Sequence, residues 1–230
     1  GEALETLYPE RLEGLYGLLA HHFALSGDRE RAIGYSRQAA GRALGLYAFE
    51  DAVQNLRAAL DLLPPGEQSE IRLVLGEELG DAYSLLRDGT RAIAEFLQAL
   101  EVWRALHDPD PMAEVRLHRK IVQVVSGLKW TVSVDSMQLA NEARLASRTR
   151  LIETIRPLSG IPPNLETARA LVALSTDTWR IQDPPDWEAA QELAQAAVDM
   201  AGELDSLVDL SLAYGALGNV LDGRSRLRDH

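Results

Sequence analysis

The segment that predicts the fold most directly is 79–99, LGDAYSLLRDGTRAIAEFLQA. It contains two runs of small and aromatic residues at helical spacing, separated by the break Arg87–Thr90. The first run is Leu79, Gly80 and Tyr83, and the second is Ala92, Phe96 and Ala99. Glycine and alanine let two helix backbones approach closely, while the aromatic rings fill the space that remains. The segment therefore predicts a hairpin of two packed amphipathic helices.

This pattern resembles the tetratricopeptide repeat (TPR), in which Leu-Gly-x-x-Tyr on one helix precedes Ala-x-x-x-Phe-x-x-Ala on the next. Gly76 stands where the family usually has Trp. A single hairpin leaves an apolar face uncovered, so the resemblance implies neighbouring hairpins stacked on this one. We therefore expect an all-α fold, a right-handed α-α superhelix or TPR-like solenoid, of about five helical hairpins and about ten helices.

A second resemblance covers roughly the first hundred residues, to Leu100. Ala32 and Ala52 occupy equivalent positions only 20 residues apart, against the 34 of a regular repeat. One long helix shared by two hairpins explains this spacing. The segment Leu19–Pro64 is similar to the helical junction behind the nucleotide-binding domain of multidomain bacterial signalling ATPases, including those with a class III adenylate cyclase domain. The resemblance implies that any ATPase or cyclase activity lies in other domains of a larger regulator.

Apolar residues recur at three- and four-residue spacing along most of the chain, which predicts a series of helices. We expect them at 9–25, 29–47, 50–63, 69–86, 90–106, 112–129, 134–147, 165–181, 187–204 and 207–221. Asp28 and Asp186 are expected to cap helices. Residues 1–230 are predicted to form a single solenoid, with a bend at the loop 156–164, although Val132–Val134 could instead be a short extended piece. The pair Leu217–Gly218 repeats Leu79–Gly80 without a following helix, so we expect the natural chain to continue.

Composition excludes several classes of function. The chain has 230 residues and a formal net charge of −12, which argues against nucleic acid or an anionic membrane surface as the main partner. It has no cysteine, so disulfides, thiolate metal sites and a cysteine nucleophile are excluded. No apolar run reaches the roughly 18 residues of a membrane span. We therefore expect a cytoplasmic protein kept soluble by its acidic charge.

The sequence contains no pattern that predicts catalysis. It has no Walker phosphate loop, no Gly-x-Gly-x-x-Gly, no Gly-x-Ser-x-Gly and no His-Glu-x-x-His. His21 and His22 are adjacent, and so are Glu77 and Glu78. Adjacent positions on a helix point about 100° apart, so neither pair can act on one ligand. We therefore expect no catalytic residue, no metal and no cofactor, and the chain is predicted not to be an enzyme.

In a TPR solenoid, the first helix of each hairpin lines the concave surface. Matching the chain to the TPR pattern places a set of residues on this surface, and we predict that they contact a partner. They are His21, Glu77, Asp81, Ser84, Ile121, Val125, Ser175, Trp179, Gln182 and Asn219. Trp179 offers a large, stiff anchor for a peptide, or alternatively packs against the loop at Pro184–Pro185. TPR domains that grip a terminal carboxylate use Lys and Asn in this groove. The acidic and small residues found here argue against that mode.

Acidic residues also follow one another from Asp183 to Asp209 with no Lys or Arg between them. These are either ordinary solvated helix faces or a ridge that attracts a basic partner. Our leading hypothesis is a protein-interaction, scaffold or sensor segment of a bacterial signalling or transcriptional regulator, whose partner is a protein, a peptide or another domain of the same chain. The alternatives are a helical-repeat sensor that encloses a small effector, and a structural module that self-associates as a homodimer.

Overall fold

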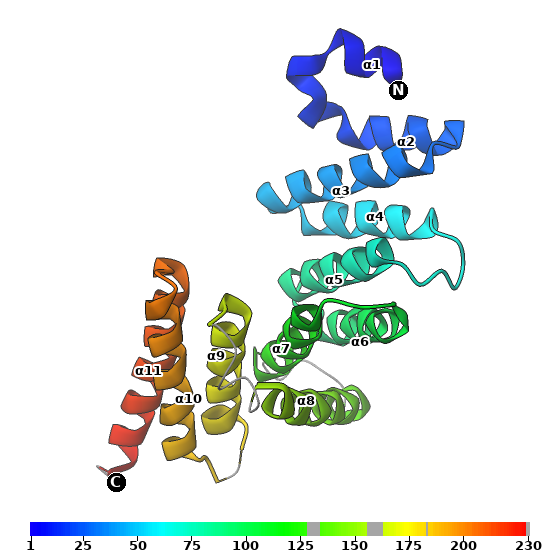
Figure 1. The fold of residues 1–230 in the computed structure, drawn as a ribbon. Helices are drawn as coiled ribbons and strands as arrows, with labels where there is room; N and C mark the ends of the chain where they lie inside the picture. The colour runs from blue at the N-terminus through cyan, green and yellow to red at the C-terminus, as the bar shows by residue number, and fades with distance from the viewer. Residues whose placement is uncertain (128–133, 156–162, 183, 229–230) are drawn as a thin grey trace. The chain divides into compact units, whose positions relative to one another are not determined.

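The computed structural model describes residues 1–127, 134–155, 163–182 and 184–228. Within these ranges every regular element is a helix, which confirms the predicted all-α class (Figure 1). The contacts group the chain into two compact units, residues 1–109 and 110–230. The expected bend at 156–164 and the alternative extended piece at 132–134 lie largely outside the described residues.

The first unit is a succession of helices, each packed on the next from α2 to α6. Its elements are α1 (Glu2–Leu7), the 3-10 helix η1 (Pro9–Leu15), α2 (Tyr16–Ser26), α3 (Arg29–Gly45), α4 (Phe49–Asp61), α5 (Glu70–Leu85) and α6 (Gly89–Ala105). The predicted helix 9–25 is α-helical only from Tyr16, and α1 was not predicted. Neither α1 nor η1 contains a fully buried residue, although Leu4, Leu12 and Leu15 are partly buried against the cluster of Leu19, Phe23 and Ala32.

The predicted hairpin is present as α5 and α6. The side chains of Leu79, Tyr83 and Phe96 are almost fully buried between these helices and their neighbours. A Cβ atom placed on Gly80 would lie only 2.4 Å from the Phe96 ring, so glycine is what allows this approach. Asp88 begins α6 by accepting a hydrogen bond from the Arg91 backbone N–H at 3.0 Å. Close packing through small residues is therefore confirmed for the stretch that predicted it.

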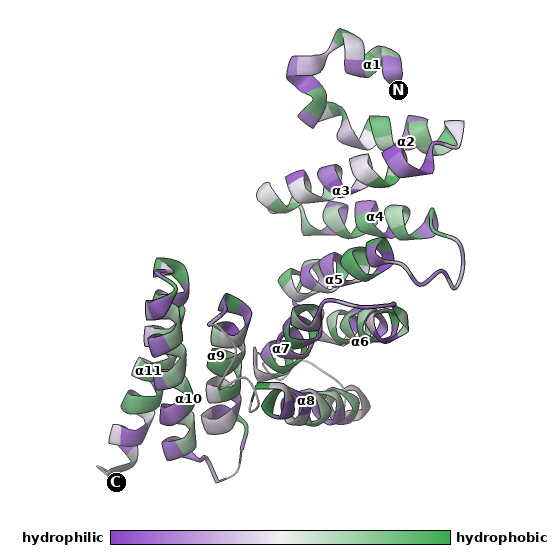
Figure 2. Cartoon of the chain, viewed as in Figure 1, coloured by the Kyte–Doolittle hydropathy of each residue, from purple (hydrophilic) through white to green (hydrophobic). Residues whose placement is uncertain are grey.

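The second unit consists of α7 (Pro111–Gly127), α8 (Val134–Ile155), α9 (Leu165–Arg180), α10 (Trp187–Glu203) and α11 (Leu207–Arg228). Helix α9 is central, because it packs on α7, α10 and α11, while α7 also packs on α8. Figure 2 shows hydrophobic and hydrophilic residues sharing each helix, as expected of amphipathic helices. The predicted caps at Asp28 and Asp186 are confirmed, since their carboxylates accept from the backbone N–H groups of Arg31 and Ala189.

Helix α8 continues to Ile155, beyond the predicted end at 147. The run Arg148–Arg150 reads as polar in the sequence, but its charges are paired in the fold. The guanidinium of Arg148 lies 3.1 Å from Asp177 on α9, and that of Arg150 lies 2.8 Å from Glu114 on α7. Leu151, one residue further on, is fully buried. Ion pairs to two neighbouring helices therefore extend α8 past the point where the apolar pattern weakens.

Candidate functional site

The predicted groove residues separate into buried and accessible groups. Four of them are buried: Glu77, Ile121, Val125 and Ser175. This corrects the expectation that these side chains are available to a partner, because helices such as α9 contact neighbours on several sides. His21 and Asn219 are exposed, and Asp81, Ser84, Trp179 and Gln182 are half-buried. The Ser84 hydroxyl donates to the Gly80 carbonyl one turn earlier in α5, whereas the Ser175 hydroxyl donates to the Ala190 carbonyl and so joins α9 to α10.

Trp179 is part of an aromatic stack that the sequence did not predict. Its ring lies 5.6 Å from that of Trp187 at the start of α10, with 23° between the planes. A Cβ atom on Gly223 of α11 would come within 2.5 Å of the Trp187 ring. Trp187 is thus held between α9 and α11, and Trp179 serves this packing rather than standing free as a peptide anchor.

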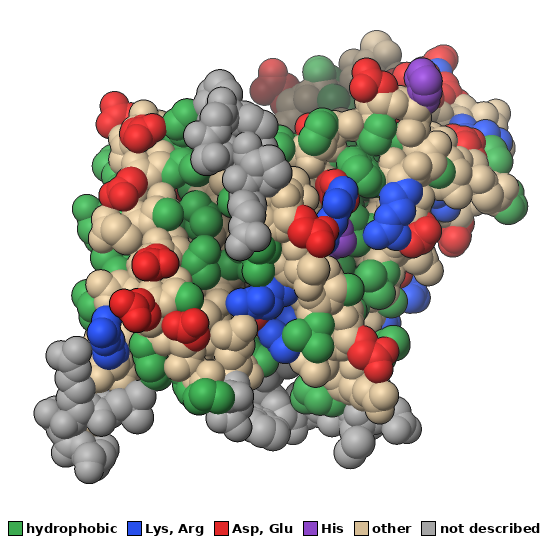
Figure 3. All heavy atoms as spheres, turned by 60° about the horizontal axis from the view of Figure 1, so that its bottom comes forward, with side chains coloured by type: hydrophobic (Ala, Val, Ile, Leu, Met, Phe, Trp, Pro, Cys, Tyr) green, Lys and Arg blue, Asp and Glu red, His purple; other side chains and the backbone are tan. Residues whose placement is uncertain are grey.

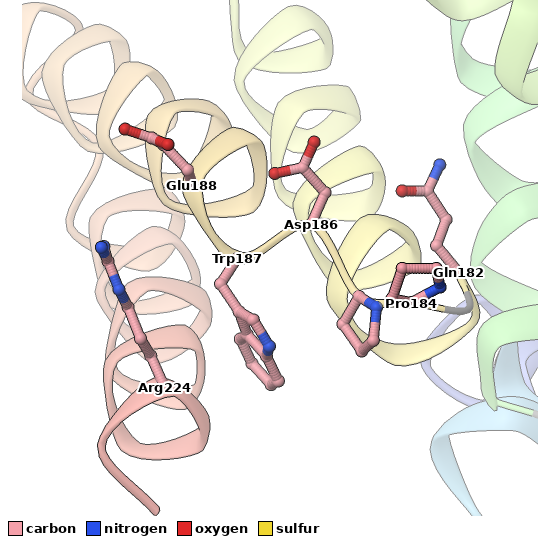
Figure 4. A pocket seen from close by; sticks show the side chains of 7 residues that line it. Gln182, Pro184, Asp186, Trp187, Glu188 and Arg224 are labelled. Carbon is pink, nitrogen blue, oxygen red and sulfur yellow. The ribbon is translucent and has the colours of Figure 1, made fainter. Parts of the chain in front are cut away.

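An open hollow of about 660 Å³ lies beside Trp187 (Figure 4). It is lined by Gln182, Pro184, Pro185, Asp186, Trp187, Glu188 and Arg224. The stack fixes Trp187 as one apolar wall, and the two prolines add a stiff loop at its edge. Arg224 extends from α11 toward α10, where its guanidinium donates to the Gln191 side chain at 2.9 Å. The hollow therefore combines an aromatic wall with both acidic and basic groups.

A second hollow of about 470 Å³ continues along α10 and shares Glu188 and Arg224 with the first. It is also lined by Gln191, Glu192, Gln195, Ala196 and Asp199. We call the two hollows together the α10 groove. The spacing of Glu188, Glu192 and Asp199 places their exposed carboxylates on one side of the helix. The side of the molecule that holds α10 and α11 carries mostly acidic charge in Figure 3.

Of the two interpretations of the acidic run, solvated helix faces or a ridge, a continuous ridge is only partly present. Asp209 is buried and forms an ion pair with Arg169 at 2.7 Å, and it accepts from the Ser206 hydroxyl at 2.6 Å. Hydrogen bonds from Arg169, and secondarily from Ser206, hold the pKa of the Asp209 carboxyl below its ordinary value. This carboxylate serves the packing of α9 on α11. Asp183 lies outside the described residues, so the exposed row is the one on α10.

The second unit also contains a buried charged cluster that sequence reasoning missed. The Asp177 carboxylate on α9 is fully buried, and both its oxygens lie 2.8 Å from the Arg144 guanidinium on α8. Arg148 adds a second cation, and the Ser126 hydroxyl on α7 donates to Asp177 at 3.2 Å. We call these four residues the Asp177 cluster. An Asp inside the apolar run LVALSTDTW was the only sequence signal for it.

A third hollow, of about 310 Å³, lies between α7 and α9 next to this cluster. It is lined by Gln123, Ser126, Gly127, Val172, Ala173, Thr176 and Arg180. Its polar groups come from both helices, but the Ser126 hydroxyl already donates to Asp177 and the Thr176 hydroxyl to the Val172 carbonyl. The other lining groups with long polar side chains are Gln123, whose carbonyl oxygen accepts from the Arg119 guanidinium at 2.7 Å, and Arg180, which is exposed.

Other sites considered from the sequence have simple outcomes. The rings of His21 and His22 are 6.1 Å apart between centroids and tilted by 57°, so they do not converge. In the part of the chain that the structure describes, no three His, Asp or Glu side chains are grouped as metal ligands. No helix within the same ranges is long and apolar enough to cross a bilayer.

No protein-family model and no curated protein sequence matches the chain.

Proposed function

We propose that this chain is a non-catalytic, TPR-like helical-repeat segment that binds a protein or peptide, within a larger bacterial signalling regulator. The repeat pattern at Leu79–Ala99 supports the family, and the contacts of α7, α9 and α11 in succession are those that stacked hairpins would make. The parent class rests on the resemblance of the first hundred residues. Binding would act through shape, by changing the position of this segment against its neighbours.

The observation that carries the proposal is the α10 groove. It is long and open, and its apolar wall is fixed in place by packing on both sides of Trp187. A rigid aromatic surface next to charged groups is suited to an extended peptide, since the ring supplies contact area at low entropic cost. The exposed carboxylates of Glu188, Glu192 and Asp199 favour Lys or Arg in that peptide. We therefore expect a basic segment with an apolar or proline residue that contacts Trp187.

Binding of fluorescent basic and acidic peptides of matched apolar content tests this proposal. The double variant Glu192→Lys, Asp199→Lys reverses two charges of the groove. It should bind the basic peptide about tenfold more weakly, and this affinity should depend less on salt concentration. The matched control reverses two exposed acids of the first unit, in Glu30→Lys with Asp61→Lys. That control changes the net charge equally and leaves the groove intact. Equal losses in both variants, or no preference for basic peptides, would contradict the proposal.

A second candidate is a sensor for a small effector, favoured by the hollow between α7 and α9. Its volume of about 310 Å³ is near the lower end for small-molecule sites, and Gln123 and Arg180 could bind an anionic group. A screen of carboxylated and phosphorylated metabolites for a rise in melting temperature tests it. A hit that Arg180→Ala abolishes would support the sensor. Retention of the same shift in that variant would place the ligand elsewhere.

A further inference from the structure

The three carboxylates of the α10 groove are unevenly spaced along the helix. Glu188, Glu192 and Asp199 are exposed and lie on one side of α10. A helix rises about 1.5 Å per residue, which places Glu192 about 6 Å beyond Glu188 and Asp199 about 10 Å beyond Glu192. The longer gap contains Gln195, whose uncharged side-chain amide donates to the Asp199 carboxylate at 2.8 Å. The row therefore consists of distinct acidic positions, with a neutral step between the last two.

Arg224 makes the end of the groove near Trp187 different from the far end. The second hollow is lined by three carboxylates and one guanidinium. Arg224 and Glu188 also line the first hollow, so these opposite charges share the end that Trp187 occupies (Figure 4). Glu192 and Asp199 line the second hollow further along α10. A cation that enters the groove is therefore attracted most strongly to these two carboxylates.

We infer, on the basis of the peptide-binding function proposed above, that the α10 groove selects its partner by the spacing between one apolar residue and two basic residues. Trp187 contacts the apolar or proline residue, which we call position 0 of the peptide. Along the helix axis, Glu192 lies about 7.5 Å from Trp187 and Asp199 about 18 Å from it. An extended peptide advances about 3.1–3.3 Å per residue. The two carboxylates therefore match Lys or Arg at positions 2 and 6.

Glu192 and Asp199 act as separate positions because they lie further apart than the range of a screened charge. Their separation of about 10 Å exceeds the Debye length of about 8 Å at physiological salt. A peptide cation that pairs with one carboxylate therefore gains little from the other. A peptide of the same net charge, but with its two basic residues adjacent, can pair well with only one of them. We expect such a peptide to bind about threefold more weakly, as the loss of one exposed ion pair predicts.

Fluorescence anisotropy with two peptides of identical composition tests the spacing on the full chain. The spaced peptide has Arg at positions 2 and 6, and the clustered peptide has Arg at positions 1 and 2. Each is made in both sequence directions, and the tighter-binding direction is compared. Asp199→Lys should weaken the spaced peptide about fivefold and the clustered peptide less than about twofold, whereas Glu192→Lys should weaken both. Asp61→Lys reverses an exposed acid of the first unit and should change neither affinity.

The outcomes distinguish a failure of the spacing from a failure of the proposed function. Equal affinities of the spaced and clustered peptides, or equal losses of both in Asp199→Lys, would overturn the spacing while leaving a groove that binds basic peptides. No preference for basic over acidic peptides would contradict the proposed function itself. A helical partner would need basic residues about five and twelve positions from the apolar one, since both helices rise equally. Tighter binding of that pattern would overturn the extended arrangement.

Gln195→Glu supplies a gain of binding, which a folding defect cannot produce. Gln195 is exposed and lies about 12 Å from Trp187 along the helix axis, so a carboxylate there matches position 4 of an extended peptide. We expect this variant to bind a peptide with Arg at positions 2 and 4 about threefold more tightly than the unmodified chain does. The gain for the spaced peptide should be smaller. No gain, or an equal gain for both peptides, would overturn the inference.

Discussion

Replacing Asp177 with Asn should destabilise the second unit severely, although the two side chains have the same shape. Asp177 is fully buried and is the shared anion of the Arg144 and Arg148 guanidinium groups. Asn removes the negative charge and directs an amide N–H₂ group at donors, so two largely buried cations lose their counterion. Loss of one partner from a buried ion pair costs about 3–5 kcal/mol. For a unit of this size that corresponds to a fall in melting temperature of roughly 10–20 °C.

Differential scanning calorimetry at neutral pH measures this effect. Asp199→Asn provides the matched control, because it makes the same change of charge and shape at an exposed position on α10. We expect the control to shift the melting temperature by no more than about 1–2 °C, as is usual for a surface substitution. Equal shifts for Asp177→Asn and Asp199→Asn would refute the reasoning, since they would show that burial and pairing of Asp177 contribute nothing particular.

An apolar replacement of the cluster separates the cost of an unpaired charge from the value of the pairing itself. In the combined variant Arg144→Met, Arg148→Met and Asp177→Leu, no charge is left buried without a counterion. Buried ion pairs replaced by apolar groups of similar volume often cost little. The triple variant should therefore melt above Asp177→Asn, despite containing three substitutions. A lower melting temperature for the triple variant would mean that the charges contribute a large net stability.

Three further outcomes are expected. Gly80→Ala should lower the stability of the first unit by about 1–3 kcal/mol, because the new Cβ would meet Phe96. Gly41→Ala should raise the stability by about 0.5–1 kcal/mol, because its Cβ position is open. A higher melting temperature for Gly80→Ala than for Gly41→Ala would contradict this reasoning. The pKa of Asp209 is lowered in the folded state, so its carboxylate contributes stability above the pKa of the unfolded chain and loses it as pH falls through the folded-state pKa. Asp209→Asn should therefore lower the free energy of unfolding less at about pH 2 than at pH 7, as measured by denaturant titration. Burial raises the pKa of the Glu95 carboxyl, so stability is lost as pH rises through its folded-state pKa. Glu95→Gln should therefore raise the melting temperature at pH 7 and have no such effect near pH 3. A gain in melting temperature that does not depend on pH would contradict burial of the charge as the cause.

The helices were largely predictable because local patterns determine them. The hairpin α5–α6, the caps at Asp28 and Asp186 and the position of α9 and α10 follow from apolar spacing, breakers and capping residues. The errors occur where tertiary contacts decide the length of a helix. Residues 9–15 have helical spacing but contain no fully buried residue, and the end of α8 is polar in sequence but paired across the fold. Sequence spacing contains no information on such cross-helix partners.

The candidate site was less predictable, because it depends on which helices meet. Trp179 was expected to line a groove, but it stacks on Trp187. Trp187 can lie there because Gly223 has no side chain, which lets the Trp187 ring pack against α11. Four predicted groove residues are buried since a helix with neighbours on several sides has little free surface. The exposed acids of α10 were predictable as a charge pattern. The hollow beside these acids was not predictable, because Pro184 and Arg224 line it from two other segments, the loop before α10 and α11.

The Asp177 cluster gives the second unit a source of specificity that apolar contacts between small residues do not. Burial of apolar side chains such as Leu151 is non-directional, so it fixes the position of α8 along its neighbours less sharply than a paired charge does. A slide of one turn is about 5.4 Å, which would carry Arg144 from hydrogen-bond distance of Asp177 to well beyond it. That displacement would leave Asp177 buried without its closest cation. A small net cost of the triple apolar variant would therefore mean that the buried charges penalise the wrong register more than they stabilise the correct one.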